Sequence, residues 1–337
     1  MTLSPHRIKD TNAMPITRRM MLLAGSAAAL LPLPTKSRAE DIIRIATLAS
    51  GTVAWEIDTI LHHGLDRKFG FTLSVVPVAG KQSADVMLAA GACDVIVTDW
   101  IWVSRQRQQG ADYTFIPYSK QIGALLIKPN SSIKTLADLK GKKIGVAGGP
   151  TDKSWILIRS FAKKTMAIDL EKDSEAAFAA PRLLNEEFER DHIDAIMTYW
   201  QFSYPLKAKG ARELIALSDV AKTLGLDPDT PLLGYVFSER LAKTHSGIAT
   251  KLARASQAAK LILAKDEEEW IRLRPLMNVE TDQDFEALKA GFRAGIPAAT
   301  MPNKVAAERL LQALSESGDT HLRGENATLA SGTFAEF

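Results

Sequence analysis

Two kinds of segment alternate along the chain from Ile42 onward, and this alternation restricts the fold more than any other feature. Short runs rich in β-branched residues predict strands, and the stretches between them have the apolar spacing of helices. Strands that alternate with helices of this length form βαβ units with mainly parallel sheets. The predicted strands are Ile42–Ala46, Leu73–Val78, Asp94–Thr98, Ala124–Ile127, Lys143–Ala147 and Asp194–Thr198. The predicted helices are Trp55–Phe69, Ser83–Ala90, Trp100–Gln109, Asp152–Met166, Pro181–Arg190 and Gln201–Gly210.

Two breaks divide this alternation into two series. The first series ends around residues 118–123, and the second stops at a proline-rich loop, Asp227–Pro231. The remainder is almost entirely helical, and we expect this tail to pack back on the first series. The fold class is therefore α/β, with two lobes joined by a two-crossover hinge and a cleft between them. Lobe 1 is expected to comprise residues 40–119 plus 235–337, including the helical C-terminal tail, and lobe 2 residues 120–234.

The first 39 residues have the pattern of a bacterial export signal. Arg18 and Arg19 precede an uncharged apolar run, Leu22–Leu33, and Ser37-Arg38-Ala39 offers small residues to signal peptidase. The run is shorter than the ~20 residues that span a bilayer, which argues against an anchor. The paired arginines resemble the twin-arginine subtype, although the general secretory route stays open. We expect cleavage near Ala39 and a periplasmic mature protein, whether translation starts at Met1 or Met14.

Charge and cysteine content exclude several classes of function. The net charge is +3 over 337 residues, which gives no field that would attract nucleic acid or anionic lipid. Cys93 is the single cysteine and cannot form an internal disulfide, so a buried thiol is the expected state. No later segment is apolar for long enough to cross a membrane.

Motifs for catalysis and cofactors are missing. The chain has no Gly-x-Gly-x-x-Gly after the first strand and no Gly-x-Ser-x-Gly, and Gly148-Gly149-Pro150 lacks the ending of a phosphate-binding loop. His62 and His63 are adjacent, so we expect their rings to point apart on a helix. Asp99, Asp152 and Glu56 are a poor match to a calcium loop. We therefore expect no catalytic residues, no cofactor and no metal site, and a protein that is not an enzyme.

Loops that follow the predicted strands are the expected ligand site, because ligands of open α/β sheets bind at the carboxyl ends of strands. Small residues there let backbone N–H groups approach a ligand, and helix N-termini favour electron-rich groups. Several loops also carry hydroxyls, carboxylates or large aromatics, and tryptophan in a loop is rarely left uncovered. The candidate ligand-binding residues are Thr52, Trp55, Lys81, Asp99, Trp100, Thr151, Asp152, Ser154, Tyr199 and Trp200.

Each candidate also has an ordinary structural explanation. Thr151, Asp152 and Ser154 suit the N-terminus of any helix, where such side chains cap free N–H groups. Trp55 falls on an early helical turn and could belong to the core, and Lys81 could be a solvated lysine. The hypothesis of a ligand site therefore depends on the five loops together, because all of them follow predicted strands and have residues suited to contact a ligand.

Two segments resemble the substrate-binding proteins of ABC transporters for nitrate, sulfonates, taurine and thiamine-pyrimidine precursors. Leu88–Val95 is close to that family's apolar-x-x-Gly-x-x-Asp-Val turn. Ile133–Val146 is closer still to its segment Leu-x-Asp-Leu-Lys-Gly-Lys-x-Ile-Gly-Val. The resemblance covers the chain from about Ile42 to the helical tail. It implies the fold of a type II periplasmic binding protein that closes around one small-molecule solute.

The same resemblance implies a partner and a set of ligand contacts. The partner would be an ABC transporter permease in the inner membrane, and we expect a monomeric receptor. Family contacts would fall on the ten candidate residues given above. Asp99 and Asp152 depart from what an anion receptor would use, because a carboxylate repels a bare sulfonate or nitrate. Aromatics with carboxylates better suit a heterocycle with N–H donors or a taurine-like zwitterion.

Two alternatives to a receptor stay open. One is an enzyme of the pyrimidine-precursor synthase type on the same scaffold, which would need a Cys/His metal cluster that Cys93, His62 and His63 are not expected to form. The other is a periplasmic accessory protein that has lost its small ligand, which would show as a cleft filled by long or apolar side chains.

Overall fold

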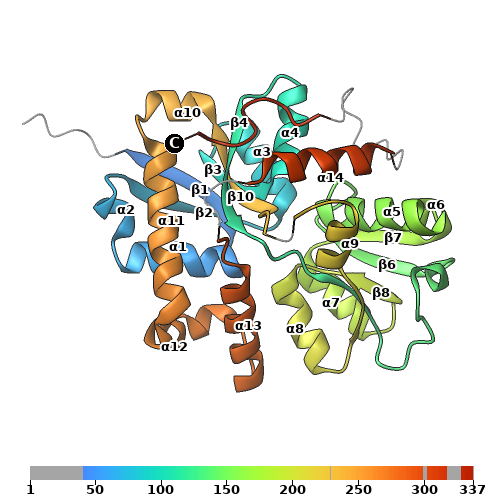
Figure 1. Ribbon diagram of the computed structural model, residues 1–337. Helices are drawn as coiled ribbons and strands as arrows, with labels where there is room; N and C mark the ends of the chain where they lie inside the picture. The colour runs from blue at the N-terminus through green and yellow to red at the C-terminus, as the bar shows by residue number, and fades with distance from the viewer. Residues whose placement is uncertain (1–40, 228, 299–301, 317–327, 337) are drawn as a thin grey trace, which may run out of the picture. The chain divides into compact units, whose positions relative to one another are not determined.

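The computed structural model describes residues 41–227, 229–298, 302–316 and 328–336. They belong to one compact unit that starts at residue 40 (Figure 1). The predicted export signal, its cleavage position and both candidate start residues lie outside the described residues. Among the helices that are described, none combines the length and the apolar character needed to cross a membrane.

The first sheet has five strands in the order β2-β1-β3-β10-β4. Strands β1 to β3 are parallel, with Ile45 opposite both Val75 and Val95, and β10 runs antiparallel to β3 and β4. Its strands are β1 (Ile42–Leu48), β2 (Thr72–Val78), β3 (Val95–Asp99), β4 (Tyr113–Ser119) and β10 (Leu233–Ser238). The helices between them are α1 (Thr52–His62), α2 (Leu65–Lys68), α3 (Lys81–Ala89) and α4 (Trp100–Gln108).

The second sheet repeats this arrangement in the order β7-β6-β8-β5-β9. Strands β7, β6 and β8 are parallel to one another, β5 pairs antiparallel with β8, and β9 pairs antiparallel with β5. Its strands are β5 (Ala124–Ile127), β6 (Lys143–Ala147), β7 (Glu175–Ala179), β8 (Ala195–Met197) and β9 (Arg212–Ala216). Its helices are the short 3-10 helix η1 (Leu136–Leu139), α5 (Lys153–Met166), α6 (Leu170–Asp173), α7 (Pro181–Glu189), α8 (Trp200–Ala208) and α9 (Leu217–Thr223).

The described residues after β10 form α10 (Glu239–Thr244), α11 (Ile248–Lys265), α12 (Glu267–Met277), α13 (Asp282–Gly295) and α14 (Lys304–Glu316). Helices α11 and α12 pack on α1 of the first lobe, as expected for the tail. Helix α14 instead lies against α5 of the second lobe (Figure 1), so the prediction that the whole tail packs on the first lobe is wrong for this helix. Leu310 and Leu314 on the apolar face of α14 belong to the same buried cluster as Leu157 and Ile158 of α5.

Two α/β lobes of this topology confirm the predicted fold class. The predicted helix Trp55–Phe69 is divided into α1 and α2 at Gly64, whose left-handed φ of 58° interrupts the helix. Because the parallel strands of each sheet end on the side that faces the other lobe, the loops after β1, β3 and β6 meet in one place. That place is the site described next.

Candidate functional site

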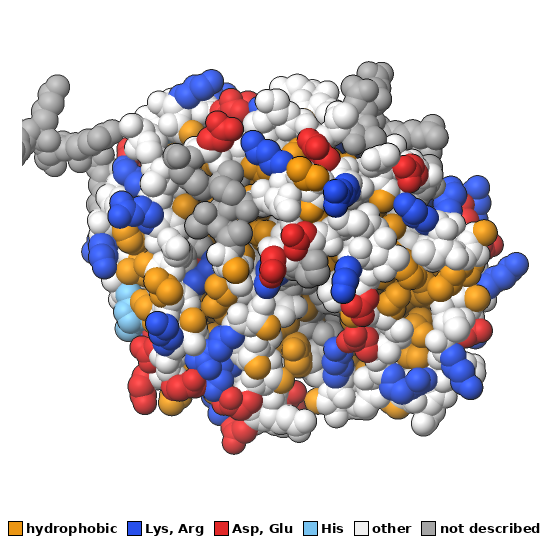
Figure 2. Space-filling model, in the orientation of Figure 1, with side chains coloured by type: hydrophobic (Ala, Val, Ile, Leu, Met, Phe, Trp, Pro, Cys, Tyr) orange, Lys and Arg blue, Asp and Glu red, His pale blue; other side chains and the backbone are white. Residues whose placement is uncertain are grey.

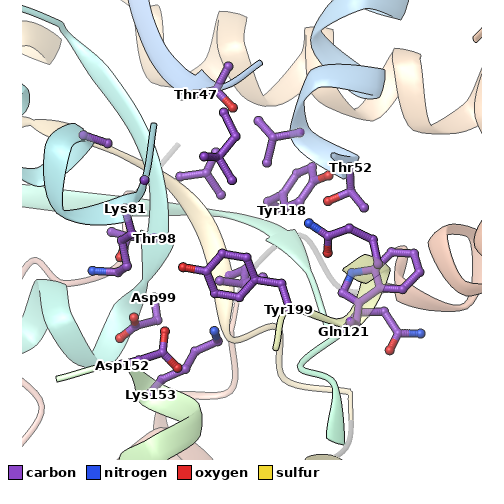
Figure 3. Close-up of a pocket in the computed structure, with 18 of the residues that line it drawn as sticks. Thr47, Thr52, Lys81, Thr98, Asp99, Tyr118, Gln121, Asp152, Lys153 and Tyr199 are labelled. Carbon is purple, nitrogen blue, oxygen red and sulfur yellow. The ribbon is translucent and has the colours of Figure 1, made fainter. Parts of the chain in front are cut away.

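A cavity of about 120 Å³ lies between the two lobes, at the carboxyl ends of their strands. Most of its wall is apolar, and a smaller set of polar side chains converges on it (Figure 3). A volume of this size suits a ligand about as large as benzene, which fills engineered cavities of roughly 150 Å³. The polar lining residues are Thr47, Thr52, Lys81, Thr98, Asp99, Tyr118, Gln121, Asp152, Lys153, Tyr199 and Gln201.

Two carboxylates at the cavity each cap a helix. Asp99 begins α4 and accepts a 2.8 Å hydrogen bond from the Trp102 N–H, while Asp152 begins α5 and accepts one of 2.8 Å from the Ser154 N–H. Only one oxygen of Asp152 is used in this way. Its Oδ2 atom is buried and has no hydrogen-bond partner among the described residues. A buried carboxylate oxygen without a donor is costly, so this atom is suited to accept a hydrogen bond from a ligand.

Three other helices reach the cavity without such a cap. Helices α1, α3 and α8 begin at Gly51, Gly80 and Tyr199, and no described side chain caps them. The Phe202 N–H of α8 donates to the Tyr199 carbonyl at 2.8 Å, whereas the first N–H groups of α1 and α3 stay available. The helix dipole makes these ends favourable for an anionic or electron-rich group. Gly51 has a φ of 109°, which a residue with a side chain would rarely adopt. A Cβ atom there would lie 3.0 Å from Nε2 of Gln201, so the glycine also lets the two lobes approach.

The two lysines of the wall differ in how they are paired. Lys81 forms a 2.8 Å ion pair with Asp85 and lies 5.4 Å from the ring centre of Trp102. Lys153 is 6% exposed, and no hydrogen bond or ion pair joins its ammonium group to another described residue. With Lys81 neutralised by Asp85, the wall has two carboxylates against one unpaired ammonium. This excess favours a ligand that carries a positive or N–H-donating group.

Tyrosine and threonine hydroxyls complete the lining. Burial raises the pKa of the Tyr199 hydroxyl far above its ordinary value, and the nearby carboxylate of Asp152 raises it further. Burial likewise raises the pKa of Tyr118, with Glu56 adding to the shift. Thr98 Oγ1 is buried without a partner among the described residues. Figure 3 shows Tyr199 between two groups of side chains, Asp99, Asp152 and Lys153 on one side and Thr47, Thr52 and Tyr118 on the other.

Six of the ten predicted ligand-binding residues line this cavity: Thr52, Lys81, Asp99, Asp152, Tyr199 and Trp200. Trp200 is 6% exposed and has a second role, because its ring also packs against the first lobe, 6.5 Å from Trp55 and against Gly291. Thr151 is exposed and lies outside the wall. Ser154 is buried beside Asp152 as its capping partner and does not line the cavity.

The other two predicted residues belong to the core. Trp100 is fully buried with its ring 5.8 Å from that of Phe334, and Trp55 is 1% exposed with its ring 6.0 Å from that of Trp270. Neither residue lines this cavity, and aromatic residues from the C-terminal part of the chain pack against both rings. Six polar residues that line the cavity were not among the ten candidates: Thr47, Thr98, Tyr118, Gln121, Lys153 and Gln201. Lys153 lies between Asp152 and Ser154, which are both among the candidates. Tyr118 lies at the start of the first break in the alternation of strands and helices, where polar and aromatic residues interrupt it.

An exposed hydrogen bond joins the two lobes next to residues that line the cavity. Gln82 of α3 donates from Nε2 to the Gly148 carbonyl of the second lobe at 2.8 Å. Gly148 and Gly149 both have a φ of 90°, and Cβ atoms on them would lie 2.4 Å from Asp152 Oδ2 and 2.5 Å from Gln82 Nε2. Glycine at both positions thus lets the loop between β6 and α5 reach both the capping carboxylate and the opposite lobe.

The histidines lie elsewhere, at the far end of α1. The rings of His62 and His63 are 5.0 Å apart, so the prediction that they point apart is wrong. His63 follows the last helical residue, where the backbone leaves the helix and allows the two rings to approach. Glu269 completes a group of three possible ligand atoms within 4.8 Å of one another. None of the three residues lines the cavity.

Comparisons with known proteins identify relatives of this fold. The family described as NMT1/THI5 like matches residues 63–269. The alkanesulfonate-binding protein SsuA from Xanthomonas axonopodis pv. citri, bound to MOPS, superposes with a TM-score of 0.70 and 18% identity, covering 88% of this chain and 99% of that one. The periplasmic aliphatic sulphonate binding protein SsuA from Escherichia coli gives 0.68 and 19%, covering 88% and 93%.

An enzyme has a similar fold. The desulfurization enzyme DSZB superposes with a TM-score of 0.56 and 14% identity, covering 87% of this chain and 98% of that one. No curated protein matches the chain. The structural likenesses confirm the type of fold, and the family match, which covers more than half of the chain, confirms the resemblance found in the sequence. The chain belongs to the NMT1/THI5-like family.

Proposed function

We propose that this protein is a periplasmic solute receptor of an ABC importer that encloses a small organic molecule between its lobes. The molecule has an amino or ammonium group and, opposite it, an anionic or electron-rich group, as in a taurine-like zwitterion or an aminopyrimidine. The observation that carries the proposal is that Asp152 lines the cavity and that its buried Oδ2 atom has no hydrogen-bond partner among the described residues.

The donor group of the solute is placed beside Asp152 and Asp99. A hydrogen bond to a charged group contributes about 1.5–3 kcal/mol, and a carboxylate binds an ammonium group more strongly than a neutral donor. Both carboxylates already have one oxygen fixed by a helix N-terminus. Their geometry is therefore set before the ligand arrives, which lowers the entropy lost on binding.

The electron-rich group of the solute is placed at the start of α1. That helix has no described side-chain cap, and the hydroxyl groups of Thr52, Thr47 and Tyr118 line the same part of the wall. Free N–H groups at a helix N-terminus together with hydroxyl donors suit a sulfonate, a carboxylate or a ring nitrogen. The apolar wall between the two ends suits a short aliphatic or aromatic body.

Binding of the solute would be coupled to closure of the two lobes. The two lobes would close about a hinge near residues 119–123 and 231–235. Lobe 1 comprises residues 40–119 plus 235–337, and lobe 2 comprises residues 120–234. Helix α14 would move with the second lobe. The closed receptor would be a monomer that docks on a permease in the inner membrane, after export directed by residues 1–39. The fold of the two SsuA proteins supports a receptor of this type.

A thermal-shift screen of the purified protein against amino-sulfonates, sulfonates, aminopyrimidines and nitrate tests the proposal. A solute at a hundred times its dissociation constant should add about 2.7 kcal/mol of stability. Recovery of the solute unchanged, checked by mass spectrometry, separates a receptor from an enzyme. A panel in which the amino compounds give no shift would contradict the proposed ligand class.

Asp152→Asn then tests the site itself. Asparagine still caps a helix, so the fold is retained while the ion pair with the ligand is lost. We expect binding of the solute found in the screen to weaken about tenfold to a hundredfold by calorimetry. Asp266→Asn is the matched control, because Asp266 caps α12 outside the cavity in the same way. Unchanged or tighter binding by Asp152→Asn would refute the assignment.

A further inference from the structure

We propose a second, separate site that binds a divalent transition metal such as Zn²⁺, formed by His62, His63 and Glu269. The ligand atoms of these three residues lie within 4.8 Å of one another. Two imidazoles and one carboxylate are a ligand set that zinc uses, with water in the fourth position. This inference does not depend on the proposed solute.

The distances suit a metal ion. His63 Nε2 and Glu269 Oε2 are 3.3 Å apart. Two donors that each lie ~2.0–2.1 Å from zinc in a tetrahedral site are about 3.4 Å from each other. An ion can therefore bridge this pair with little movement of either side chain. The ring of His62, at 5.0 Å from that of His63 and perpendicular to it, is exposed and free to turn toward the same point.

The carboxylate of Glu269 is held in place by other residues and keeps one position open. Oε1 accepts hydrogen bonds from Thr59 Oγ1 at 2.7 Å and from Arg272 Nη2 at 2.8 Å. Oε2 accepts one from Arg272 Nε at 2.9 Å. Because each carboxylate oxygen has two lone pairs, the second lone pair of Oε2 is left for the group that faces it, which is His63. Outer partners of this kind orient metal ligands.

The site lies away from the cavity. Helix α1 has eleven residues and is thus roughly 16 Å long, and it begins at the cavity with Thr52 and ends at His62. The C-terminal end of a helix favours a cation, because its last carbonyl groups carry partial negative charge. Figure 1 shows this helix beside α12, which carries Glu269. His62 and His63 are both exposed, and Figure 2 shows that histidine colour appears on this face of the molecule. A bound metal would link α1 to α12 within the first lobe.

Titration of the full chain with ZnCl₂ by calorimetry, and with Co²⁺ by absorption spectroscopy, tests this site. We expect one tight equivalent at the site and the visible bands of Co²⁺ bound to nitrogen and oxygen ligands. His62→Ala and His63→Ala should each weaken zinc binding at least tenfold, because each removes one of three protein ligands. His192→Ala is the matched control, since His192 also pairs with a carboxylate, that of Glu187 at 2.9 Å, on an exposed surface.

Zinc binding of wild-type strength in either His62→Ala or His63→Ala would overturn the proposal, as would no zinc binding by the wild-type chain. Loss of the same equivalent in His192→Ala would also overturn it. Affinity for the solute found in the screen should be the same in EDTA and in ZnCl₂. The two proposals therefore fail independently of each other.

Discussion

The two lobes have the same strand order, yet the first helix of each begins differently at the cavity. Helix α1 begins at Gly51 without a described side-chain cap, whereas α5 begins at Asp152, whose carboxylate caps it. Five residues farther on, α1 has Glu56 and α5 has Leu157, and both are fully buried. The N-terminus of α1 thus presents helix N–H groups and that of α5 presents a carboxylate, which is what a ligand with two unlike ends requires.

The largest expected effect comes from Glu56, which receives hydrogen bonds from Tyr235, Ser256 and Lys260. Burial lowers the pKa of Lys260, which Glu56 opposes. Glu56→Leu places in α1 the residue type that α5 has at the corresponding position, Leu157. It also leaves the buried ammonium group of Lys260 unpaired, so we expect the free energy of unfolding in urea to fall by about 3–5 kcal/mol. Glu56→Leu with Lys260→Met should lose less. A single variant within 1 kcal/mol of wild type would show that the pair is not needed.

Substitutions of Trp200 and Trp155 distinguish the role of the lobe interface from that of the core of lobe 2. Both are buried tryptophans of the second lobe, but only Trp200 lines the cavity and packs on Trp55. Trp200→Leu should weaken solute binding on the order of tenfold to a hundredfold, the scale of a lost aromatic contact. Trp155→Leu should lower the midpoint of urea unfolding while calorimetry finds the affinity unchanged. Equal losses of affinity in both variants would contradict this division.

Gly148 and Gly110 test the loop between β6 and α5. Their φ angles, 90° and 93°, are almost equal, but a Cβ would touch Asp152 at Gly148 and nothing within 4 Å at Gly110. Alanine at either position should cost roughly 1 kcal/mol of stability through the backbone. Gly148→Ala should in addition displace Asp152 and reduce affinity for the solute. If the two variants bind equally well, the loop does not position the carboxylate.

The smallest effect is expected for the hydrogen bond from Gln82 to Gly148, which joins the two lobes. Gln82→Ala should cost about 0.5–1.5 kcal/mol, because one exposed hydrogen bond is lost. The change should appear as faster solute release in stopped-flow measurements. Gln109→Ala, a change to an exposed glutamine at the end of α4, is the control. A release rate equal to that of the control would mean that this bond does not hold the lobes closed.

Much of the fold could be predicted from the sequence, because β-branched runs are strong strand signals. Two of the missed strands lack that signal: β7 is Glu-Ala-Ala-Phe-Ala and β9 is Arg-Glu-Leu-Ile-Ala. Strand β4, Tyr-Thr-Phe-Ile-Pro-Tyr-Ser, was also missed, although it contains β-branched and aromatic residues. Strand β10 was not predicted for another reason. It pairs with β3, which lies more than a hundred residues earlier in the chain. Pairing of this kind depends on tertiary structure that no local pattern records.

The candidate site was predicted in part, for a similar reason. Strand-end loops and helix caps are local features, so Asp99 and Asp152 could be found from their neighbours. Whether an aromatic ring faces a ligand depends on distant residues, and Trp100 is covered by Phe334 near the C-terminus. The closeness of His62 and His63 likewise depends on where α1 ends.

Calorimetric titration with matched pairs of solutes tests the central claim most directly. The pairs are 2-aminoethanesulfonate with ethanesulfonate, and an aminopyrimidine with the same ring lacking its amino group. If Asp152 and the N-terminus of α1 bind opposite ends of the solute, the amino member of at least one pair binds at least tenfold more tightly, and this preference disappears in Asp152→Asn. Equal or tighter binding of the members without an amino group would contradict the account.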